Sequence, residues 1–590
     1  MKRYFRGSAI YLVGLVLLLV SCGKKEIAQP TLFTKLPSDQ THVLFRNDLK
    51  YDAKFNIYTY RNFYNGGGVA LGDVNNDGLV DLYFSANQGP NKLYINKGNF
   101  VFEDITEKAG VAGTHAWSTG VSMADVNGDG WLDIYVCNSG NVDGDDKENE
   151  LFMNNGNLTF TERAAELGVA DKGYSTHAVF FDYDKDGDLD LYILNNSYKA
   201  IGSFNLQKNE RGKRDPLGGH KLMRNDHGHF TDVSVQAGIY GSVIAFGLGV
   251  TVGDMNKDGW QDIYVSNDFF ERDYLYLNNK DGTFKECLTT SMKSISGASM
   301  GADLADINND AYPDLFVTEM LPRSNERLKT VTTFENWDKY QYNVANDYYH
   351  QFTRNMLQVN NQDGTFSEIG RLANVEATDW SWGALMFDAD NDGLKDIFVA
   401  NGIYQDLTNQ DYLQYAGSEE VVRSILSGKQ IDYKKLIDII PSHPVSNFLF
   451  QNKGNYKFDD KATEWGLFEP GFSNGSAYGD LDNDGDLDLV VNNVNREAFL
   501  YKNESDKMLP KNHYLKFILK GEGLNVQALG TEITVESGGS KFYLEQMPMR
   551  GFESTVDSRL NFGLGNLDRV EKVTIDWPDG RVTVMNSVKT

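Results

Sequence analysis

The sequence predicts an all-β protein, with a seven-bladed β-propeller followed by a small C-terminal β-sandwich-like domain. One acidic nine-residue segment occurs seven times, at starts that are 52 to 92 residues apart. Apolar strand-forming residues stand before and after each copy, and a further apolar run with a turn and an aromatic residue follows. A basic period of about fifty residues indicates a repeat architecture. Four short strands in each repeat are typical of a propeller blade.

The repeated segment carries acidic or amide residues at positions 1, 3, 5 and 9, most clearly in Asp182 to Asp190, with Gly187 at position 6. Oxygens on alternate residues of a tight turn converge on one point, and glycine allows the positive φ that the turn needs. The pattern therefore predicts structural Ca²⁺ sites, up to seven in all. An EF-hand loop closes with Glu at position 12 and enters a helix, whereas these segments close with Asp at position 9 and enter a strand.

The predicted metal ligands are the side chains at these four positions in every copy. They are Asp73, Asn75, Asp77 and Asp81; Asp125, Asn127, Asp129 and Asp133; Asp182, Asp184, Asp186 and Asp190; Asp254, Asn256, Asp258 and Asp262; Asp306, Asn308, Asp310 and Asp314; Asp388, Asp390, Asp392 and Asp396; and Asp480, Asp482, Asp484 and Asp488. The fifth copy has Ala311 at the glycine position and Pro313 before its last ligand. We expect that site to be the weakest, or empty.

The chain is strongly acidic, with a formal net charge of −27 over 590 residues. Most of the acidity belongs to the predicted ligands, and seven Ca²⁺ ions would bring the net charge to −13. A surface of this sign argues against nucleic acid as a partner. The length exceeds that of one simple core, so two or more folding units are expected.

The N-terminus is typical of an export signal, with Lys2, Arg3 and Arg6 before an apolar run that is too short to span a membrane. Residues 19–22 (LVSC) resemble a bacterial lipobox, which implies lipidation of Cys22 after removal of the signal. We therefore expect residues 1–22 to be a lipoprotein signal and 23–30 a polar tether. The protein would be anchored at the bacterial outer membrane or cell surface. The alternative is an ordinary cleaved signal with an uninvolved cysteine.

The propeller is expected to span residues 31–505, with insertions at 197–220, 318–351 and 402–446. The last repeat lacks the final strand that ends the others, and the segment from Leu32 to Leu36 resembles it. We predict that this segment pairs with the last repeat and closes the ring, which removes open sheet edges. The two cysteines after Cys22, Cys137 and Cys287, fall in different repeats and are expected to be free thiols.

The repeats, which read for example DVNNDGLVD followed by LYFSAN, resemble FG-GAP or VCBS repeats, the calcium-loop blades of integrin alpha-subunit propellers. Residues 512–590 form a different unit with strand-like runs such as TEITVES. The segments ALGTEITVESGG, SRLNFGLGN and VTIDWPDG resemble the ASPIC/UnbV domain, which also occurs in proteins similar to cartilage acidic protein. The last strand of that family looks clipped at Thr590, so the chain could be a fragment.

No catalytic or cofactor-binding residues are predicted. Residues 471–475 spell GxSxG, but the segment leads into a strand rather than the strand, turn and helix of a hydrolase elbow. We expect a binding or adhesion module for an extracellular protein or glycan. One alternative is a polysaccharide-acting enzyme with the propeller funnel as its active site. Another is a structural part of a surface nutrient-capture complex. The aromatic insertion at 318–351 could serve a ligand or only pack on the ring, and apolar spacing in 402–446 predicts a helical cap on one face.

Overall fold

In the computed structural model, which describes residues 30–197, 209–332, 336–418 and 433–589, each acidic segment joins the first two strands of an antiparallel four-stranded array. The predicted signal, the lipidation site Cys22 and the tether up to residue 29 lie outside the described residues. Within the described part, no helix is both long and apolar enough to cross a bilayer. Residues Leu32–Thr590 form one compact unit.

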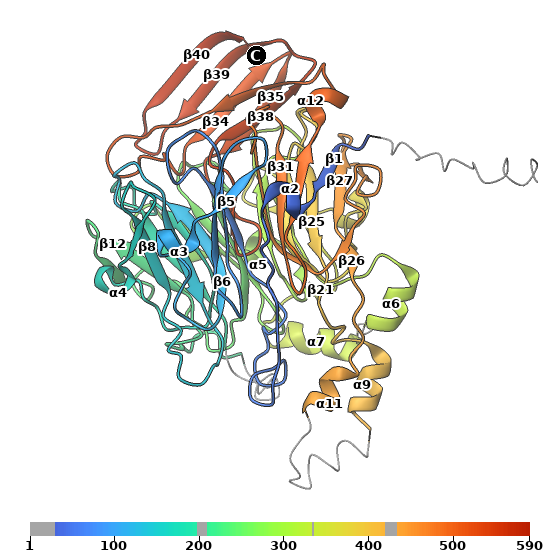
Figure 1. Cartoon of the computed structure of the whole chain (residues 1–590). Coiled ribbons are helices and arrows are strands. Elements are labelled where there is room, and N and C mark those ends of the chain that lie inside the picture. The colour runs from blue at the N-terminus through green and yellow to red at the C-terminus, as the bar shows by residue number, and fades with distance from the viewer. Residues whose placement is uncertain (1–29, 198–208, 333–335, 419–432, 590) are drawn as a thin grey trace, which may run out of the picture. The chain divides into compact units, whose positions relative to one another are not determined.

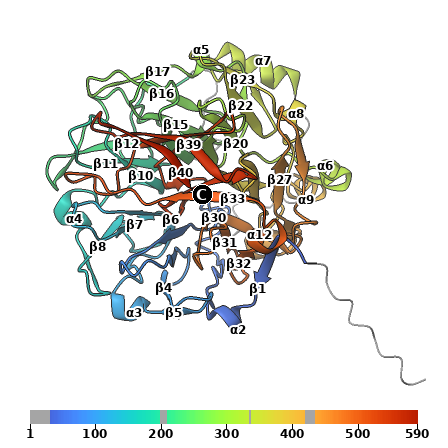
Figure 2. The ribbon, with the colours of Figure 1, turned by 90° about the horizontal axis from the view of Figure 1, so that it is seen from above.

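Seven arrays of four antiparallel strands follow one another along the chain (Figure 2), and the first is extended to a six-stranded sheet by two short C-terminal strands, one of which pairs in parallel with its first strand. They are β2 (Val69–Gly72), β3 (Asp81–Phe84), β4 (Lys92–Asn96), β5 (Phe102–Asp104); β6 (Ser118–Ala124), β7 (Asp133–Asn138), β8 (Glu150–Asn154), β9 (Phe160–Glu162); β10 (Ser175–Phe181), β11 (Asp190–Asn195), β12 (Lys221–Asn225), β13 (Phe230–Asp232); β14 (Gly247–Gly253), β15 (Asp262–Asn267), β16 (Tyr274–Asn278), β17 (Phe284–Glu286); β19 (Ala302–Ala305), β20 (Asp314–Val317), β22 (Met356–Asn360), β23 (Phe366–Glu368); β24 (Ser381–Phe387), β25 (Asp396–Asn401), β27 (Phe448–Asn452), β28 (Phe458–Asp460); and β30 (Ser473–Gly479), β31 (Asp488–Asn493), β32 (Phe499–Asn503), β1 (Phe33–Leu36).

The first strands of these arrays form the inner part of the fold. Each contacts the first strand of the next array, and β30 of the last array contacts β2 of the first. These first strands are almost entirely buried, as in β14 (GLGVTVG), because both faces of each array pack against a neighbour. Continuous apolar runs suit such strands better than simple alternation. The architecture is therefore all-β and propeller-like.

Strand β1 is the outer strand of the last array, although it stands at the other end of the chain. It pairs antiparallel with β32, with Phe33 opposite Asn503 and Leu36 opposite Leu500. Phe33 is buried, and its backbone N–H donates to the carbonyl of Trp465 at 2.8 Å. The predicted pairing of this segment with the last repeat is confirmed.

Short helices follow several outer strands or lie in the insertions. They are α2 (Ser38–Thr41), α3 (Thr106–Ala109), α4 (Ala164–Leu167), α5 (Leu288–Ser291), α6 (Asn325–Val331), α7 (Trp337–Ala345), α8 (Gly370–Ala373), α9 (Gln410–Ala416), α11 (Tyr433–Asp438) and α12 (Ser505–Met508). Figure 1 shows α6, α7, α9 and α11 together at the end of the unit opposite the C-terminal strands. Small two-stranded sheets join β18 (Ile295–Ser296) to β21 (Gln351–Phe352) and β26 (Val445–Ser446) to β29 (Pro470–Gly471).

The C-terminal residues build further sheets beside the acidic loops. Strands β33 (His513–Phe517) and β38 (Leu560–Gly565) pair, and β35 (Ser540–Glu545), β34 (Glu532–Ser537), β39 (Arg569–Asp576) and β40 (Val582–Lys589) form a second sheet. Alternate residues of β34 are buried, as expected for a sheet with one packed face. Their side chains Ile533 and Val535 share a core with Phe562 and Val573.

One segment of the C-terminal region lies among the inner strands, an arrangement that sequence reasoning did not anticipate. Strands β36 (Met549–Arg550) and β37 (Ser554–Thr555) contact β2, β6, β10, β14, β19 and β30, and Phe552 packs on Trp382 with ring centres 5.2 Å apart. A Cβ added at Gly68 would lie 1.7 Å from the carbonyl oxygen of Glu553. Gly68 thus allows close packing against this axial segment, residues 549–555, whereas Gly66 and Gly67 pack closely against Asn474 and Ser85.

Candidate metal centres

The seven acidic loops share one backbone conformation. The residue at position 6 has a positive φ in each copy, from 70° at Ala311 to 95° at Gly393 and Gly485. Position 4 is also left-handed in each, for example 60° at Lys185. Ala311 therefore keeps the turn despite its Cβ, at a cost that glycine does not bear.

The aspartate at position 9 starts the second strand of each array and is buried in all seven copies. In the third loop, Asp190 Oδ2 accepts the N–H of Tyr183 at 3.1 Å and Oδ1 accepts that of Asn225 at 2.8 Å. The same pair of bonds recurs at Asp81 and Asp488. These bonds fix the carboxylate but leave lone pairs on both oxygens, since a carboxylate can accept about four hydrogen bonds.

Positions 1 and 5 hold the turn. Asp388 Oδ1 accepts the N–H of Asp392 at 3.0 Å, and its Oδ2 accepts that of Gly393 at 2.8 Å. Asp392 in turn accepts the N–H of Leu394 at 2.9 Å. The loop is thus preorganised by its own side chains before any cation binds.

The structure brings together positions 1, 3 and 9 in the three loops that carry Asp at position 3. In each, one oxygen from each carboxylate lies within 4.8 Å of the other two; the groups are Asp182, Asp184 and Asp190; Asp388, Asp390 and Asp396; and Asp480, Asp482 and Asp488. The predicted ligands at position 5 are not part of these three groups. Converging carboxylate oxygens are the donor set of Ca²⁺.

These groups contain buried oxygens with no hydrogen-bond donor. They are Asp182 Oδ1, Asp184 Oδ1, Asp390 Oδ1 and Asp482 Oδ1. A buried acceptor without a partner is costly, and a cation bound there would satisfy it. The residues present therefore fit a hard divalent ion.

Burial raises the pKa of several carboxyl groups in the acidic loops. The negative charges of neighbouring carboxylates raise it further. The pKa of Asp182 rises to about 7, with burial as the main cause and the neighbouring Asp186 and Asp184 as further causes. The pKa of Asp81 rises to about 8, again chiefly through burial. A divalent cation would reverse this effect by favouring the charged carboxylates.

Four loops carry asparagine at position 3, namely Asn75, Asn127, Asn256 and Asn308. In the first loop, Asn75 Oδ1 accepts the N–H of Asp77 at 3.0 Å, and its Nδ2 donates to Asp77 Oδ2 at 3.0 Å. These loops offer one negative charge fewer than the all-aspartate loops. We therefore expect them to bind Ca²⁺ more weakly, because ligand charge sets much of the affinity.

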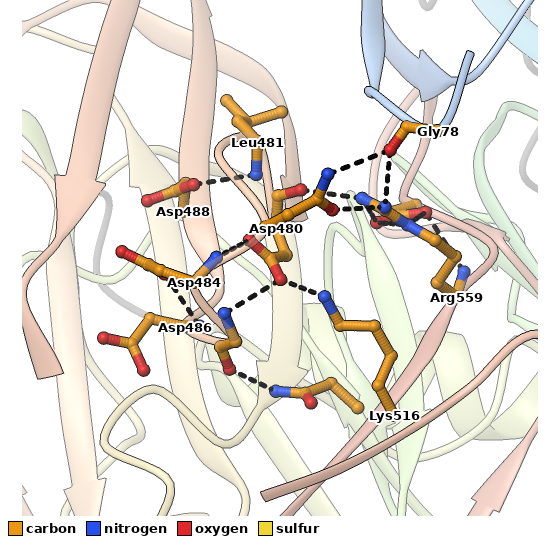
Figure 3. Close-up of polar contacts among 12 residues, drawn as sticks. Gly78, Asp480, Leu481, Asp484, Asp486, Asp488, Lys516 and Arg559 are labelled. Atoms are coloured by element: carbon orange, nitrogen blue, oxygen red, sulfur yellow. Dashed lines mark hydrogen bonds and ion pairs between the residues drawn. The ribbon is translucent and has the colours of Figure 1, made fainter. Parts of the chain in front are cut away.

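Lysines contact the carboxylates of the seventh loop, and Figure 3 shows Lys516 beside Asp480. Lys516 Nζ, from β33, bonds Asp480, and Lys502 Nζ, from β32, bonds Asp482 and Asp484. An ammonium group in this position offsets carboxylate charge and competes with a cation. Among the described residues, no lysine bonds the carboxylates of the third or the sixth loop, so we expect both to bind Ca²⁺ more tightly than the seventh.

Sequence reasoning missed an asparagine that ends the third strand of each array. In the sixth array, Asn452 donates its backbone N–H to Asp396 at 2.7 Å, and its Nδ2 donates to the carbonyls of Lys395 and Ile307 at 3.1 and 2.8 Å. Ile307 belongs to the preceding loop, so one side chain joins two neighbouring loops. The signal was present as the Asn in LYIN, LFMN, LMRN, LYLN, LQVN, LFQN and LYKN.

A second set of bonds joins position 4 of one loop to position 6 of the next. Asn76 donates to the carbonyl of Gly130 at 2.9 Å, and Asn309 donates to that of Gly393 at 3.0 Å. Asn483 of the last loop donates to the carbonyl of Gly78 in the first at 3.0 Å. The loops are thus connected side by side, including the last with the first.

The structure also places other residues that the sequence singled out. Ser473 of the GxSxG segment starts β30, is buried, and donates to Asn493 Oδ1 at 2.9 Å. Cys137 and Cys287 are buried free thiols, as predicted. In the insertions, α7 and α9 provide helices on one end of the unit. Residues 333–335 of the aromatic insertion and 419–432 of the expected helical cap lie outside the described residues.

Comparisons with known proteins agree with these features. Residues 73–136 and 254–317 match the model of an FG-GAP-like repeat, and residues 521–590 match the model named ASPIC and UnbV. The chain carries FG-GAP-like repeats and an ASPIC and UnbV domain. Both resemblances expected from the sequence are thereby confirmed, and the FG-GAP-like repeats span the first, second, fourth and fifth acidic loops.

Relatives of known name match parts of this chain. Cartilage acidic protein 1 of Mus musculus is 26% identical over 225 residues, which cover 38% of this chain and 31% of that protein. Integrin alpha-6 of Homo sapiens is 34% identical over 88 residues, which cover 13% of this chain and 8% of that protein. The chain thus matches less than a third of the length of these relatives. The V. cholerae biofilm matrix protein Bap1 aligns over 92% of this chain and 61% of its own, at 9% identity and a TM-score of 0.30, a similarity too low to carry an argument.

Proposed function

We propose that this protein is an exported, lipid-anchored propeller of seven blades that binds Ca²⁺ and serves as a binding or adhesion module for an extracellular protein or glycan. The FG-GAP-like repeats and the similarity to integrin alpha-6 point to an extracellular binding or adhesion-type module. The converging carboxylates with unpartnered buried oxygens carry the calcium proposal. Export and the anchor at Cys22 rest on the N-terminal sequence.

Three observations support a closed ring of seven blades. The inner strand β30 contacts β2, the N-terminal strand β1 completes the last array, and Asn483 bonds the carbonyl of Gly78. Each joins the end of the repeat region to its beginning. A ring of this kind leaves no long open sheet edge, which protects the protein from edge-to-edge aggregation.

Calcium in such loops acts on stability rather than on chemistry. At millimolar Ca²⁺ and affinities of about 10⁻⁴ to 10⁻³ M, each occupied site would add roughly 0.4 to 1.4 kcal/mol. Seven such sites would contribute about 3 to 10 kcal/mol, which is comparable with the whole stability of a typical domain. The module would then hold its shape in calcium-rich surroundings and loosen without calcium.

Thermal unfolding tests the calcium proposal. The protein without its signal should melt at a much lower temperature in chelator than in millimolar Ca²⁺, and Mg²⁺ should restore little of the loss. The double variant Asp182→Asn/Asp184→Asn should lose part of the calcium response. Asp281→Asn, which changes an exposed turn outside the loops, should keep it. An equal melting temperature with and without calcium would refute the proposal.

Binding and anchoring need separate measurements. The soluble protein should capture a protein or glycan from an array of extracellular components in calcium, and lose the same hits in chelator. Cys22→Ala should move the full chain from the membrane fraction to the soluble fraction of its host. Hits that persist unchanged in chelator, or membrane association that survives the substitution, would count against these parts of the proposal.

A further inference from the structure

A cavity of about 1010 Å³ opens on the face opposite the acidic loops. Its floor includes Leu248, Met300 and Trp382, which lie at the starts of the fourth, fifth and sixth arrays, whereas the acidic loops follow the ends of the same first strands. Its walls come from residues 57–65, from 268–270, and from α7 and α9 of the insertions. The cavity therefore joins segments that are hundreds of residues apart in sequence.

Apolar and aromatic side chains make up most of the lining. Phe246 and Phe269 meet edge to face with ring centres 4.7 Å apart, and Trp337 stacks on Tyr340 at 5.4 Å. The side chain of Trp337 is 70% exposed, which is unusual for so large an apolar group. Concave, mostly apolar sites of roughly 300–1,000 Å³ with a few placed polar groups are typical of small-molecule pockets.

Arg61 supplies a cation inside this apolar wall. Its guanidinium lies 5.8 Å from the centre of the Phe269 ring, and burial lowers its pKa. Within the part of the chain that the structure describes, its N–H groups have no hydrogen-bond acceptor. Arg61 is exposed at the cavity, and a guanidinium that is bonded to no acceptor of the described chain offers a donor fork suited to a planar anionic group.

The charged groups of the cavity offset one another in part, because the charges of Arg61 and Lys339 act against burial on the pKa of Asp268. Asp268 is buried, accepts the N–H of Phe269 at 2.6 Å, and has a pKa raised to about 7 by burial. Glu319 accepts the N–H of Met320 at 2.6 Å. Lys339 Nζ lies 5.4 Å from the centre of the Phe270 ring and adds a second cation. A cationic ligand would thus meet Arg61 and Lys339 as well as Asp268.

We propose that this cavity binds an amphiphilic small molecule whose ring system packs against the aromatic walls and whose carboxylate or sulfonate accepts hydrogen bonds from Arg61. This inference goes beyond the proposed function, because it concerns a small ligand and a face that holds none of the acidic loops. The apolar body of the ligand would leave water, and the anionic group would satisfy the donors of Arg61.

A titration with anilinonaphthalenesulfonate, an aromatic anion that fluoresces in apolar surroundings, tests the proposal on the folded protein in millimolar Ca²⁺. We expect saturable binding of one dye per chain. Arg61→Met should weaken binding about tenfold or more, because a hydrogen bond to a charged group is lost. Arg61→Lys should bind with intermediate affinity, and Asp268→Asn should bind the anion more tightly than the wild type. Arg371→Gln, at an exposed arginine outside the cavity, should leave binding unchanged.

Two further measurements keep the result interpretable. Ala298→Phe, which fills the cavity from its lining, should reduce binding of the dye while the melting temperature shows that the variant is folded. Nile red, a neutral apolar dye, should bind Arg61→Met and wild type equally. The proposal would be overturned if folded Arg61→Met or folded Ala298→Phe bound the anionic dye as well as the wild type does. Binding of many dye molecules per chain would overturn it too. Because the acidic loops are intact in all these variants, failure here leaves the calcium response of melting untouched.

Discussion

The face that carries the acidic loops consists of seven nearly identical turns, whereas the opposite face is made of unlike insertions around a cavity. On the first face, each loop repeats the same hydrogen bonds. In each, for example, the backbone N–H of position 2 donates to the carboxylate of position 9. On the second face, residues 57–65, α7 and α9 have no counterparts in the other repeats as far as the structure describes them. We propose that the two faces have different functions: the repeated face stabilises the fold through calcium, and the irregular face binds ligands.

The axial segment, residues 549–555, lies between the two faces. It starts from the sheets beside the acidic loops, and its Phe552 packs on Trp382 in the floor of the cavity. Arg550 of this segment is buried and pairs with Asp303 at 3.2 Å. This segment of the C-terminal region is therefore part of the core of the repeat region, whereas the C-terminal sheets have a core of their own.

Calcium removal should separate the two faces most strongly. In chelator, amide hydrogen exchange should become faster in the seven loops and in the strands that they join. The reason is that the free energy of unfolding falls by roughly 3 to 10 kcal/mol in total when calcium leaves. Exchange in α7 and α9, measured under conditions where the protein stays folded, should change little. An equal increase of amide hydrogen exchange on both faces would contradict this assignment of functions to the two faces.

The axial segment gives the next largest effect. Arg550→Met should destabilise the protein by about 3 to 5 kcal/mol, because it leaves the Asp303 carboxyl buried without its partner. Arg550 also donates to the carbonyl of Leu304 at 2.9 Å. The double variant with Asp303→Asn should recover part of the loss in chemical denaturation, and Arg371→Met should have no effect. A loss below 1 kcal/mol would mean that the segment is only loosely held.

The asparagines between loops should contribute less. Asn452→Ala removes the bonds to the carbonyls of Ile307 and Lys395 and should cost about 1 to 3 kcal/mol. Asn361→Ala, in an exposed turn, should stay within about 0.5 kcal/mol of the wild type. Equal effects of the two substitutions in denaturant titrations would show that the loop-to-loop bonds do not stabilise the ring.

The fifth loop offers the smallest effect. Ala311 has a φ of 70°, so Ala311→Gly should relieve backbone strain and stabilise the protein by about 0.5 to 1 kcal/mol. It should also strengthen the calcium response of that loop. Ala373→Gly, in α8, should instead destabilise by about 0.5 to 1 kcal/mol. A melting temperature lowered by both substitutions would exclude strain at Ala311.

The repeated face could be predicted from the sequence because each residue type has the same task in every copy. The Asp at position 9 starts a strand seven times, as the apolar residues after it predict. The third-strand asparagines were visible but had no assigned role until the structure showed their bonds to two loops. The pairing of β1 with β32 was predictable because the last repeat lacked a strand.

The axial segment and the cavity could not be predicted in the same way. Met549 to Thr555 occurs once, so no periodicity marks it, and its place depends on the small residues of the inner strands, such as Gly68. The cavity depends on Arg61, Phe269 and Trp337, which come from three unrelated segments. Contacts between distant, unrepeated segments leave no local pattern in the chain.

Diffraction from crystals grown in millimolar Ca²⁺, recorded at a wavelength where calcium scatters anomalously, tests the central claim most directly. The account predicts peaks in the acidic loops, stronger in the third and sixth than in the seventh, with oxygens of Asp182, Asp184 and Asp190 at about 2.3 to 2.6 Å from the ion of the third. Anomalous density absent from all three loops whose carboxylates converge would contradict it.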